Sequence, residues 1–317
     1  MKIVKIVLWL GVALLFLGAI IFGVAFAYSG FDIQFLSNVQ TEYKTFEENA
    51  DNEITSLSID YNTAEVVVYV SDDIDALSVQ YPQKQNKKGE NLAVIIVQET
   101  QNALSIKETP KPAFFSFDFS QPTVSVYLPQ ERVYTLDLQT TTGTIRLASG
   151  NLSVSKITLQ ATTGMISTKD CAVSSAGEAC FETTTGIVNA GELSAQTVVL
   201  KTTTGLLTAH KTITAETSVS IETTTGSIKA LDTITANTVT AKATTGDLKI
   251  TAEIYANAIT LETTTGDLNA RLGGKKADYS ILVAQSTGKS NISKQTGGTK
   301  TLNVSCSTGD IYVTFAE

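Results

Sequence analysis

Few residues in this sequence have the type and spacing that enzyme chemistry needs. Its 317 residues include a single histidine, His210, which lies in an Ala-His-Lys-Thr stretch between two predicted strands. The sequence has no Gly-x-Ser-x-Gly turn, no histidine pair at metal-binding spacing and no glycine-rich phosphate loop. We therefore predict a protein that is not an enzyme and that needs no cofactor. A glycan-active β-helix enzyme is the alternative, because some β-solenoids cleave polysaccharides with clustered acidic residues.

Two aspartates are weak candidates for a metal site. Asp247 and Asp267 each follow a glycine in successive repeats, so we expect one carboxylate to lie above the other. Ca²⁺ takes about 6–8 oxygen ligands, and two carboxylates are far fewer. Lys229 and Lys249 lie two positions further along the repeat on the same face. We therefore expect salt bridges here and no metal ion.

The three cysteines, Cys171, Cys180 and Cys306, do not form a disulfide framework. They include no Cys-x-x-Cys metal-binding pair, and an odd number leaves at least one thiol unpaired. We predict that most of them are small core residues, because free cysteine is often buried. A reactive thiol is the alternative, and the sequence leaves the redox state open.

The first 30 residues have the pattern of a membrane anchor. Residues 6–27 carry no charge, and this length matches the ~20 apolar residues that a bilayer-spanning helix needs. Lys2 and Lys5 precede the run, so the positive-inside rule places residues 1–5 in the cytoplasm and the rest of the chain outside. We predict a single-pass protein of the cell membrane. The alternative is a cleaved signal peptide, with Ala25-Phe26-Ala27 as the cleavage site.

A Thr/Ser-Thr-Gly triplet recurs every 19 to 22 residues through the second half of the chain. Such a period is typical of one small structural unit that is copied and stacked. The triplets end at Gly143, Gly164, Gly186, Gly205, Gly226, Gly246, Gly266, Gly288 and Gly309.

Apolar residues alternate with polar ones at period two on both sides of each glycine. Around Gly226 they are Val219 and Ile221 before it, and Ile228 and Ala230 after it. Period two indicates strands, so the repeat predicts an all-β fold, a β-solenoid of about 20-residue coils after one transmembrane helix. We expect each glycine to form a structural turn with a positive φ, so that Gly226→Val lowers stability.

Polar columns should stack along the outside of such a solenoid. Four residues before each glycine, the middle coils read Glu182, Lys201, Glu222, Lys242 and Glu262. This alternation predicts pairing between neighbouring coils and control of their register. The two Thr/Ser columns before the glycine favour stacked strands. Ordered water or ice on these hydroxyls, or contact with a glycan, are alternatives.

The domain organisation follows from where the repeat is regular. We predict a juxtamembrane stalk or short polar helix over 28–53, a divergent solenoid and cap region over 54–130, and regular repeats over 131–317. Ala64 takes the glycine's place in an early copy of the repeat. It lies 79 residues before Gly143, a length that corresponds to about four coils.

Four phenylalanines lie close together in a Pro-containing insertion of the early region. We predict that they help to cover the open end of the solenoid, with Ile311–Phe315 covering the other end. The alternative is an exposed partner-binding patch. These residues are Phe114, Phe115, Phe117 and Phe119.

The charge of the chain limits the classes of partner. The formal net charge is −8, and an acidic protein lacks the basic stripe that nucleic acid requires. We expect no nucleic acid partner. The predicted partners are the membrane, through the N-terminal helix, and a cell-wall polymer or an envelope protein.

The run VSVYLPQERVYTLDLQTTTGTIRL (Val124–Leu147), the repeated TTTG units and the closing STGDIYVTF together resemble a known family. It is the bacterial candidate-adhesin domain of unknown function, and the resemblance covers residues 54–317. An N-terminal membrane segment is typical of that family, and the resemblance implies no catalytic residues. It implies an adhesin-like or envelope-associated binding scaffold. The alternative is an accessory protein of envelope-stress signalling that contacts a membrane partner.

Overall fold

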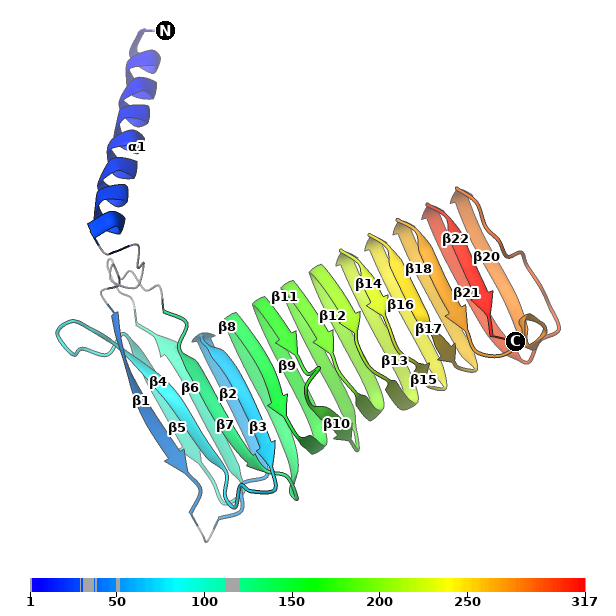
Figure 1. Cartoon of the computed structure of the whole chain (residues 1–317), viewed down its shortest axis with the longest axis horizontal. Helices are drawn as coiled ribbons and strands as arrows, with labels where there is room; N and C mark the ends of the chain where they lie inside the picture. Colours follow the sequence, from blue (N-terminus) through cyan, green and yellow to red (C-terminus); the bar gives the residue numbers. More distant parts are fainter. Residues whose placement is uncertain are drawn as a thin grey trace. The chain divides into compact units, whose positions relative to one another are not determined.

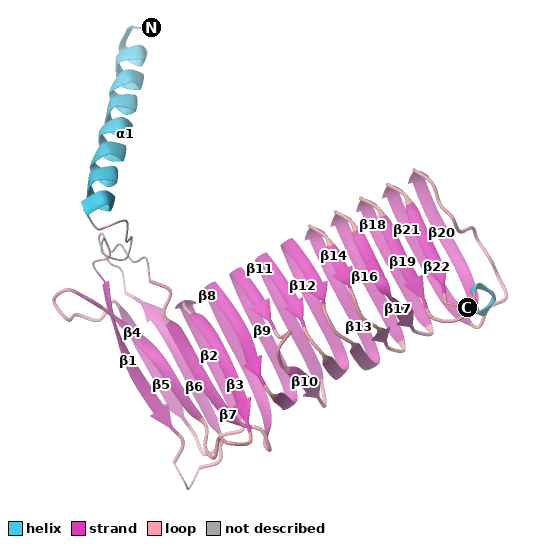
Figure 2. Cartoon of the chain, viewed as in Figure 1, coloured by secondary structure: helices cyan, strands magenta, loops and turns pink. Residues whose placement is uncertain are grey.

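The computed structural model describes residues 2–28, 30, 37, 39–49, 52–111 and 120–316. Their regular structure is one long helix, one short 3-10 helix and strands (Figure 2). The chain divides into two compact units. The first comprises Met1–Glu42, Gln83–Val94 and Pro110–Gln121, and the second comprises Tyr43–Pro82, Ile95–Thr109 and Pro122–Glu317.

The elements follow one another along the chain with short connections. Up to the first regular repeat they are α1 (Lys2–Tyr28), β1 (Val39–Glu47), β2 (Ser56–Thr63), β3 (Glu65–Ser71), β4 (Ser78–Asn86), β5 (Ala93–Glu99), β6 (Ala103–Pro110) and β7 (Thr123–Pro129). The repeats contain β8 (Val133–Ser149), β9 (Asn151–Ser167), β10 (Ala172–Ser175), β11 (Glu178–Ala190), β12 (Leu193–Ala209), β13 (Ile213–Thr225), β14 (Ile228–Ala230), β15 (Ile234–Thr235), β16 (Thr238–Thr245), β17 (Leu248–Tyr255), β18 (Ala258–Thr265) and β19 (Leu268–Leu272). The chain ends with η2 (Lys276–Asp278), β20 (Tyr279–Thr287), β21 (Lys300–Thr308) and β22 (Ile311–Phe315).

Helix α1 belongs to the first unit and contains the whole uncharged run of residues 6–27. Among the residues that the structure describes, however, no helix is both long enough and apolar enough to cross a membrane. The spanning helix that we predicted is therefore not shown. The segment after it differs from the short polar helix that we considered, because Val39–Glu47 is a strand.

The second unit is a β-solenoid of about 8 turns with about 21 residues per turn. Figure 1 shows its strands side by side, each turn forming one rung of the stack. The repeats pair in parallel and in register, so that Gly186 lies between Gly164 and Gly205, whereas β4 pairs with β7 in antiparallel orientation. The inward columns form one continuous hydrophobic core. Val219, Ile221, Ile228 and Ala230 are all at most 1% exposed, so the predicted alternation is confirmed at these positions.

At the corner of each rung, the alternation of inward and outward side chains shifts by one residue. Thr223, three residues before Gly226, is also buried, whereas the next two threonines, Thr224 and Thr225, are both exposed. Inward positions resume with Ile228. Two consecutive outward residues cannot occur in a regular strand, in which side chains point to alternate faces. The Thr-Thr-Gly triplet therefore turns the chain from one side of the solenoid to the next.

The first rung lies in a different place from the one that the sequence suggested. Ala64 stacks directly on Gly143, because β2 and β3 pair with β8 along its whole length. The 79 residues between them do not insert four coils. Instead β6 and β7 pair with the opposite edges of β2 and β3. The rung made of β2 and β3 therefore lies between the rung made of β6 and β7 and the rung made of β8, although β6 and β7 follow β3 in the sequence.

The last rungs of the solenoid are also stacked out of sequence order. Strand β21 pairs with β18 on one side and with β20 on the other, and β22 pairs with β19. Gly309 therefore stacks on Gly266, and Gly288 stacks on Gly309. Our prediction that Ile311–Phe315 covers the end of the solenoid is wrong. The terminal rung is β20, and the loop after it closes back through an antiparallel bridge between Ile281 and Gln295.

Candidate functional site

The file of corner glycines sets the geometry of the polar face beside it. All nine predicted glycines have a positive φ, with values from 124° at Gly288 to 155° at Gly143. At Gly226, where φ is 143°, an added Cβ would lie 1.7 Å from the carbonyl oxygen of Gly205. The backbones of successive rungs therefore approach too closely for any side chain. This contact, together with the positive φ, explains why the corner is glycine in every regular repeat.

A shallow groove of about 400 Å³ runs along the outer face next to this corner, across β2, β8, β9, β11 and β12. Its lining is almost entirely hydroxyl, amide and charged groups. The residues are Asp60, Gln139, Thr140, Thr141, Gln160, Ala161, Thr162, Glu182, Thr183, Thr184, Lys201 and Thr203.

Side chains four residues before the glycine form the central file of this face. The register pairs Glu182 with Lys201 and continues through Glu222, Lys242 and Glu262, as the alternating charges predicted. Within the described part of the chain, only Lys242 and Glu262 of this file form an ion pair, at 2.9 Å. Their side chains are 45% and 43% exposed, so the pair contributes little stability. Control of register by this file stays a prediction.

A file of buried hydroxyls lies beneath the groove, and sequence reasoning missed it. Thr183 Oγ1 donates to Thr202 Oγ1 at 2.9 Å, and Thr140 Oγ1 donates to the carbonyl of Ala64 at 3.2 Å. These hydroxyls satisfy polar groups of neighbouring rungs and leave the exposed threonines free for solvent or a ligand. Thr223 Oγ1 is the exception among the described residues, since it is buried without a partner. The only sequence signal for these buried hydroxyls is the first threonine of the Thr-Thr-Thr-Gly motif, three residues before the glycine, which many repeats contain.

Asp247 and Asp267 do stack one above the other, but they act as backbone acceptors. Asp247 Oδ1 accepts the N–H of Asp267 at 2.9 Å, and Asp267 Oδ1 accepts the N–H of Asp310 at 2.9 Å. The expected salt bridges with Lys229 and Lys249 do not form among the described residues. In the same part of the chain, no group of three or more acidic, histidine or cysteine side chains could hold a metal ion.

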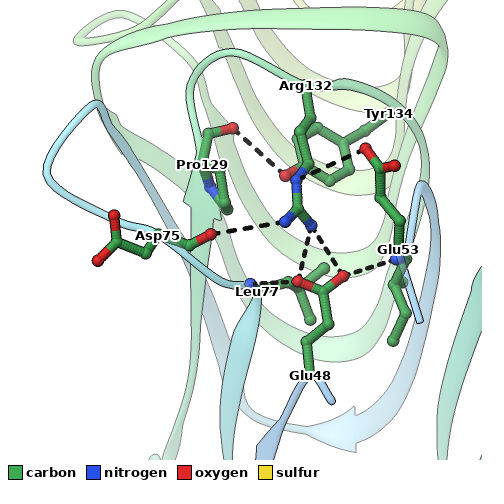
Figure 3. Close-up of polar contacts among 8 residues, drawn as sticks. Glu48, Glu53, Asp75, Leu77, Pro129, Arg132 and Tyr134 are labelled. Atoms are coloured by element: carbon green, nitrogen blue, oxygen red, sulfur yellow. Dashed lines mark hydrogen bonds and ion pairs between the residues drawn. The ribbon is translucent and has the colours of Figure 1, made fainter. Parts of the chain in front are cut away.

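A buried ion pair fixes the segment that follows β1 to the solenoid (Figure 3). Arg132 Nη1 lies 2.8 and 2.7 Å from the two carboxylate oxygens of Glu48, whose side chain is only 3% exposed. The same carboxylate accepts the N–H of Ile54 at 2.6 Å and that of Leu77 at 3.1 Å. Four segments of the second unit thus meet at one side chain. Neither partner was singled out in the sequence, because they lie 84 residues apart.

The surroundings of this pair favour the charged form of Arg132. Burial by itself lowers the pKa of the guanidinium, but the hydrogen bond and the negative charge of Glu48 outweigh that effect and leave the pKa raised. Nearby, Tyr134 donates to the carbonyl of Pro129 at 3.3 Å, and burial raises its pKa. Both side chains hold the turn between β7 and β8 in place.

A family model described as "Toastrack DUF4097" matches residues 54–314. The chain belongs to the Toastrack DUF4097 family. The match covers both the divergent first rungs of the solenoid and its regular repeats. No curated protein matches this Toastrack chain closely enough to count as a relative.

Three solved structures are similar to this Toastrack chain. A candidate cell adhesion protein from Clostridium sporogenes is 10% identical, covers 88% of this chain and 100% of its own, and has a TM-score of 0.29. A candidate adhesin from Parabacteroides distasonis is 11% identical and covers 86% and 97%, with a TM-score of 0.40. A candidate adhesin from Bacteroides fragilis is 11% identical and covers 86% of this chain and 97% of its own, with a TM-score of 0.35. Because the sequence identities and TM-scores are this low, we infer nothing about the activity of the chain from these structures.

The cysteines of the Toastrack domain are free thiols. Cys171 and Cys306 are buried, and Cys180 is half-buried. Burial raises the pKa of Cys171 to about 11 and that of Cys180 to about 12. The thiolate is the reactive form of cysteine, so these side chains are poor nucleophiles near neutral pH. His210 is half-buried and lies 3.1 Å from Asn189 through its Nε2 atom.

The four phenylalanines proposed as a cap or partner patch, Phe114, Phe115, Phe117 and Phe119, lie outside the described residues. The two interpretations of this segment therefore both stay predictions. The groove and the buried ion pair are the sites that the Toastrack fold defines.

Proposed function

We propose that this Toastrack protein is a membrane-anchored, extracytoplasmic scaffold that binds an envelope polymer through its polar groove and has no enzymatic activity. The observation that carries the proposal is the groove itself. Hydroxyl, amide and charged side chains recur there on successive rungs, next to exposed threonines such as Thr141, Thr162 and Thr184.

The spacing of these groups suits an extended, hydroxyl-rich ligand such as a glycan. Neighbouring rungs place equivalent side chains about 4.8 Å apart. Gln139 Nε2 donates to Asp137 at 3.0 Å and Gln160 Nε2 donates to Glu182 at 3.4 Å, and the carbonyl oxygens of both amides can accept from a ligand. The neighbouring threonine hydroxyls can both donate and accept hydrogen bonds. A polymer that lies along the groove would therefore meet an exposed threonine hydroxyl at each of the rungs that carry Thr141, Thr162, Thr184 and Thr203, next to an amide or charged side chain.

The placement of the carboxylates supports a binding role over hydrolysis. Asp60 and Glu182 are the acidic residues in the groove lining, and the register separates them by three rungs, or about 14 Å. Glycoside hydrolases hold their two carboxyl groups about 5–9.5 Å apart. Asp60 also forms an ion pair with Lys107 at 2.7 Å, which reduces its availability.

The membrane anchor is proposed from residues 6–27, whose uncharged run lies within α1. Lys2 and Lys5 before the run favour an outward orientation for everything after it. The Glu48–Arg132 pair supports the scaffold role, because it fixes Glu48 to the turn before β8 within the second unit.

Binding to purified, phosphate-free peptidoglycan tests the proposal. We expect the full chain in neutral detergent to bind, and Gln139→Ala/Gln160→Ala to weaken binding by roughly 10-fold because two groove amides are lost. The matched control is Asn237→Ala/Asn257→Ala, which removes a different stacked amide pair, away from the groove, in which Asn257 Nδ2 donates to Asn237 Oδ1 at 2.9 Å. The control should bind as the wild type does. Equal binding by both variants, or no binding by the wild type, would reject the groove as the site.

A further inference from the structure

The terminal rung of the solenoid differs in charge from the rest of the chain. Residues 273–300 contain five lysines and one acidic residue, Asp278, and no arginine. Their net charge is +4 against −8 for the whole chain, so the remainder carries −12. The lysines of this rung, which we call the lysine cap, are Lys275, Lys276, Lys289, Lys294 and Lys300.

Hydrogen bonds bring the two loops of the lysine cap together. Gln295 Nε2 donates to the carbonyl of Lys276 at 2.9 Å and to that of Tyr279 at 3.0 Å. Ser280 donates to the carbonyl of Gly298 at 2.9 Å, so the loops before and after β20 are joined at one corner. Lys275, Lys276 and Lys294 are carried on these joined loops, Lys300 begins β21 directly after them, and Lys289 follows the other end of β20.

The positive charges of the lysine cap are available to a ligand. Within the described residues, none of the five lysines forms an ion pair. The Asp278 carboxylate is occupied with the backbone N–H of Lys275, at 2.9 Å. Four of the lysines are exposed, and Lys300 is half-buried with its Nζ 5.4 Å from the centre of the Tyr279 ring.

Protection of an edge strand explains only part of this pattern. Charged side chains, lysine above all, keep exposed strand edges from pairing with other chains, and β20 is the terminal strand. Acidic residues would repel another copy of this acidic protein equally well. The five lysines outnumber the acidic side chains at this end of the solenoid. These are Asp278 and Asp310, which accepts the backbone N–H of Lys289 at 2.8 Å, so the surface stays attractive to anions.

We propose that the lysine cap is a docking surface for a phosphate-rich polyanion. Lysine ammonium groups are common ligands of phosphate oxygens, which they bind as compact point charges. Arginine, whose planar fork matches carboxylate and phosphate alike, is absent from the cap, so the comparison with polyglutamate below tests the preference for phosphate. The acidic remainder of the chain repels a polyanion and so directs it to the cap. This inference uses no groove residue, and it stands or falls separately from the proposed binding of glycan.

Anisotropy of labelled inorganic polyphosphate, measured with the full chain in neutral detergent, tests the docking surface. The cap variant replaces the four exposed lysines, Lys275, Lys276, Lys289 and Lys294, with glutamine. The control variant makes the same change at Lys87, Lys88, Lys229 and Lys249, which are also exposed. Both variants lose four positive charges. We expect the cap variant to bind at least about 10-fold more weakly and the control variant to stay within about 3-fold of the wild type.

Salt dependence and thermal melting distinguish binding at the lysine cap from a general charge effect and from a loss of fold. Wild-type binding should weaken as salt rises from 50 to 300 mM, because exposed charges are screened over about 10 Å at 0.1 M. The cap variant should melt at the wild-type temperature, since its four side chains lie outside the core. Equal loss of binding in both variants would show a net-charge effect and overturn the proposal. Preference for polyglutamate, or for phosphatidylglycerol vesicles, over polyphosphate would overturn it too.

Discussion

Gly226 lies at a corner where two separate constraints exclude other residues. Its φ of 143° is unfavourable for any residue with a side chain, and an added Cβ would lie 1.7 Å from the Gly205 carbonyl oxygen. We expect Gly226→Ala to lower the free energy of unfolding by roughly 3–5 kcal/mol, from strain and overpacking together. Urea unfolding followed by circular dichroism measures this loss.

Gly297 provides the matched control for this prediction, because it lies in the same unit as Gly226. Its φ is 105°, but nothing lies within 4 Å of the position that a Cβ would take. Gly297→Ala should therefore cost only about 1 kcal/mol, from conformational strain alone. Equal losses for the two variants would show that close approach between rungs does not contribute at the corner.

At the scale of elements, the Glu48–Arg132 pair joins β1 to the turn before β8. Glu48→Gln leaves Arg132 with only the exposed Glu53, 3.8 Å away, as a charged partner, and it weakens the acceptor for two backbone N–H groups. We expect a loss of roughly 2–4 kcal/mol in the free energy of unfolding, because the removal of one charge leaves the other partly buried and without full compensation. Glu262→Gln breaks an exposed pair and should cost less than about 1 kcal/mol. A loss for Glu48→Gln no larger than that for Glu262→Gln would contradict the assigned role.

The inverted order of the last rungs is a second claim about elements. In a variant whose native cysteines are replaced, Thr265→Cys/Thr308→Cys should form a disulfide on mild oxidation, because these residues are direct neighbours. Thr265→Cys/Thr287→Cys should not, because β21 lies between them and places them about 10 Å apart, beyond the reach of a disulfide. Mass spectrometry of the oxidised variants measures both. The opposite result would place the rungs in sequence order.

The repeat pattern predicted the rungs but could not predict their order at the ends. Period-two alternation and the glycine spacing identify the strands, the core columns and the charged file because each depends on local sequence. Every rung presents the same Thr-Gly edge, however, so the sequence does not distinguish Gly266–Gly309 stacking from Gly266–Gly288 stacking. The spacing from Ala64 to Gly143 suggested four coils for the same reason, since nothing local marks a chain that turns back.

The candidate sites divide in a similar way. The groove is made of the Thr/Ser and charged columns that the sequence placed on the outside, so most of its lining could be predicted. The Glu48–Arg132 pair could not, because its partners are 84 residues apart and neither occupies a column that recurs in the repeats. The salt bridges expected between Asp247, Asp267 and the nearby lysines failed because neighbouring backbone N–H groups are closer donors.

For the whole molecule, the two proposed surfaces have different chemistry. The groove offers hydroxyl and amide groups for a neutral polymer, and the lysine cap offers positive charge for phosphate. Both proposals need the second unit to lie outside the cytoplasmic membrane, which the uncharged run of residues 6–27 and its preceding lysines favour. The location of the groove is therefore the central claim.

Labelling of Thr203→Cys with a membrane-impermeant maleimide in intact cells tests this claim most directly. Thr203 is exposed in the groove, and the native cysteines should give little background because their thiols are buried or half-buried with raised pKa values. We predict labelling of Thr203→Cys in intact cells well above that of the wild type, and protection of this thiol by added peptidoglycan fragments. Labelling that occurs only after the cells are lysed would contradict the account.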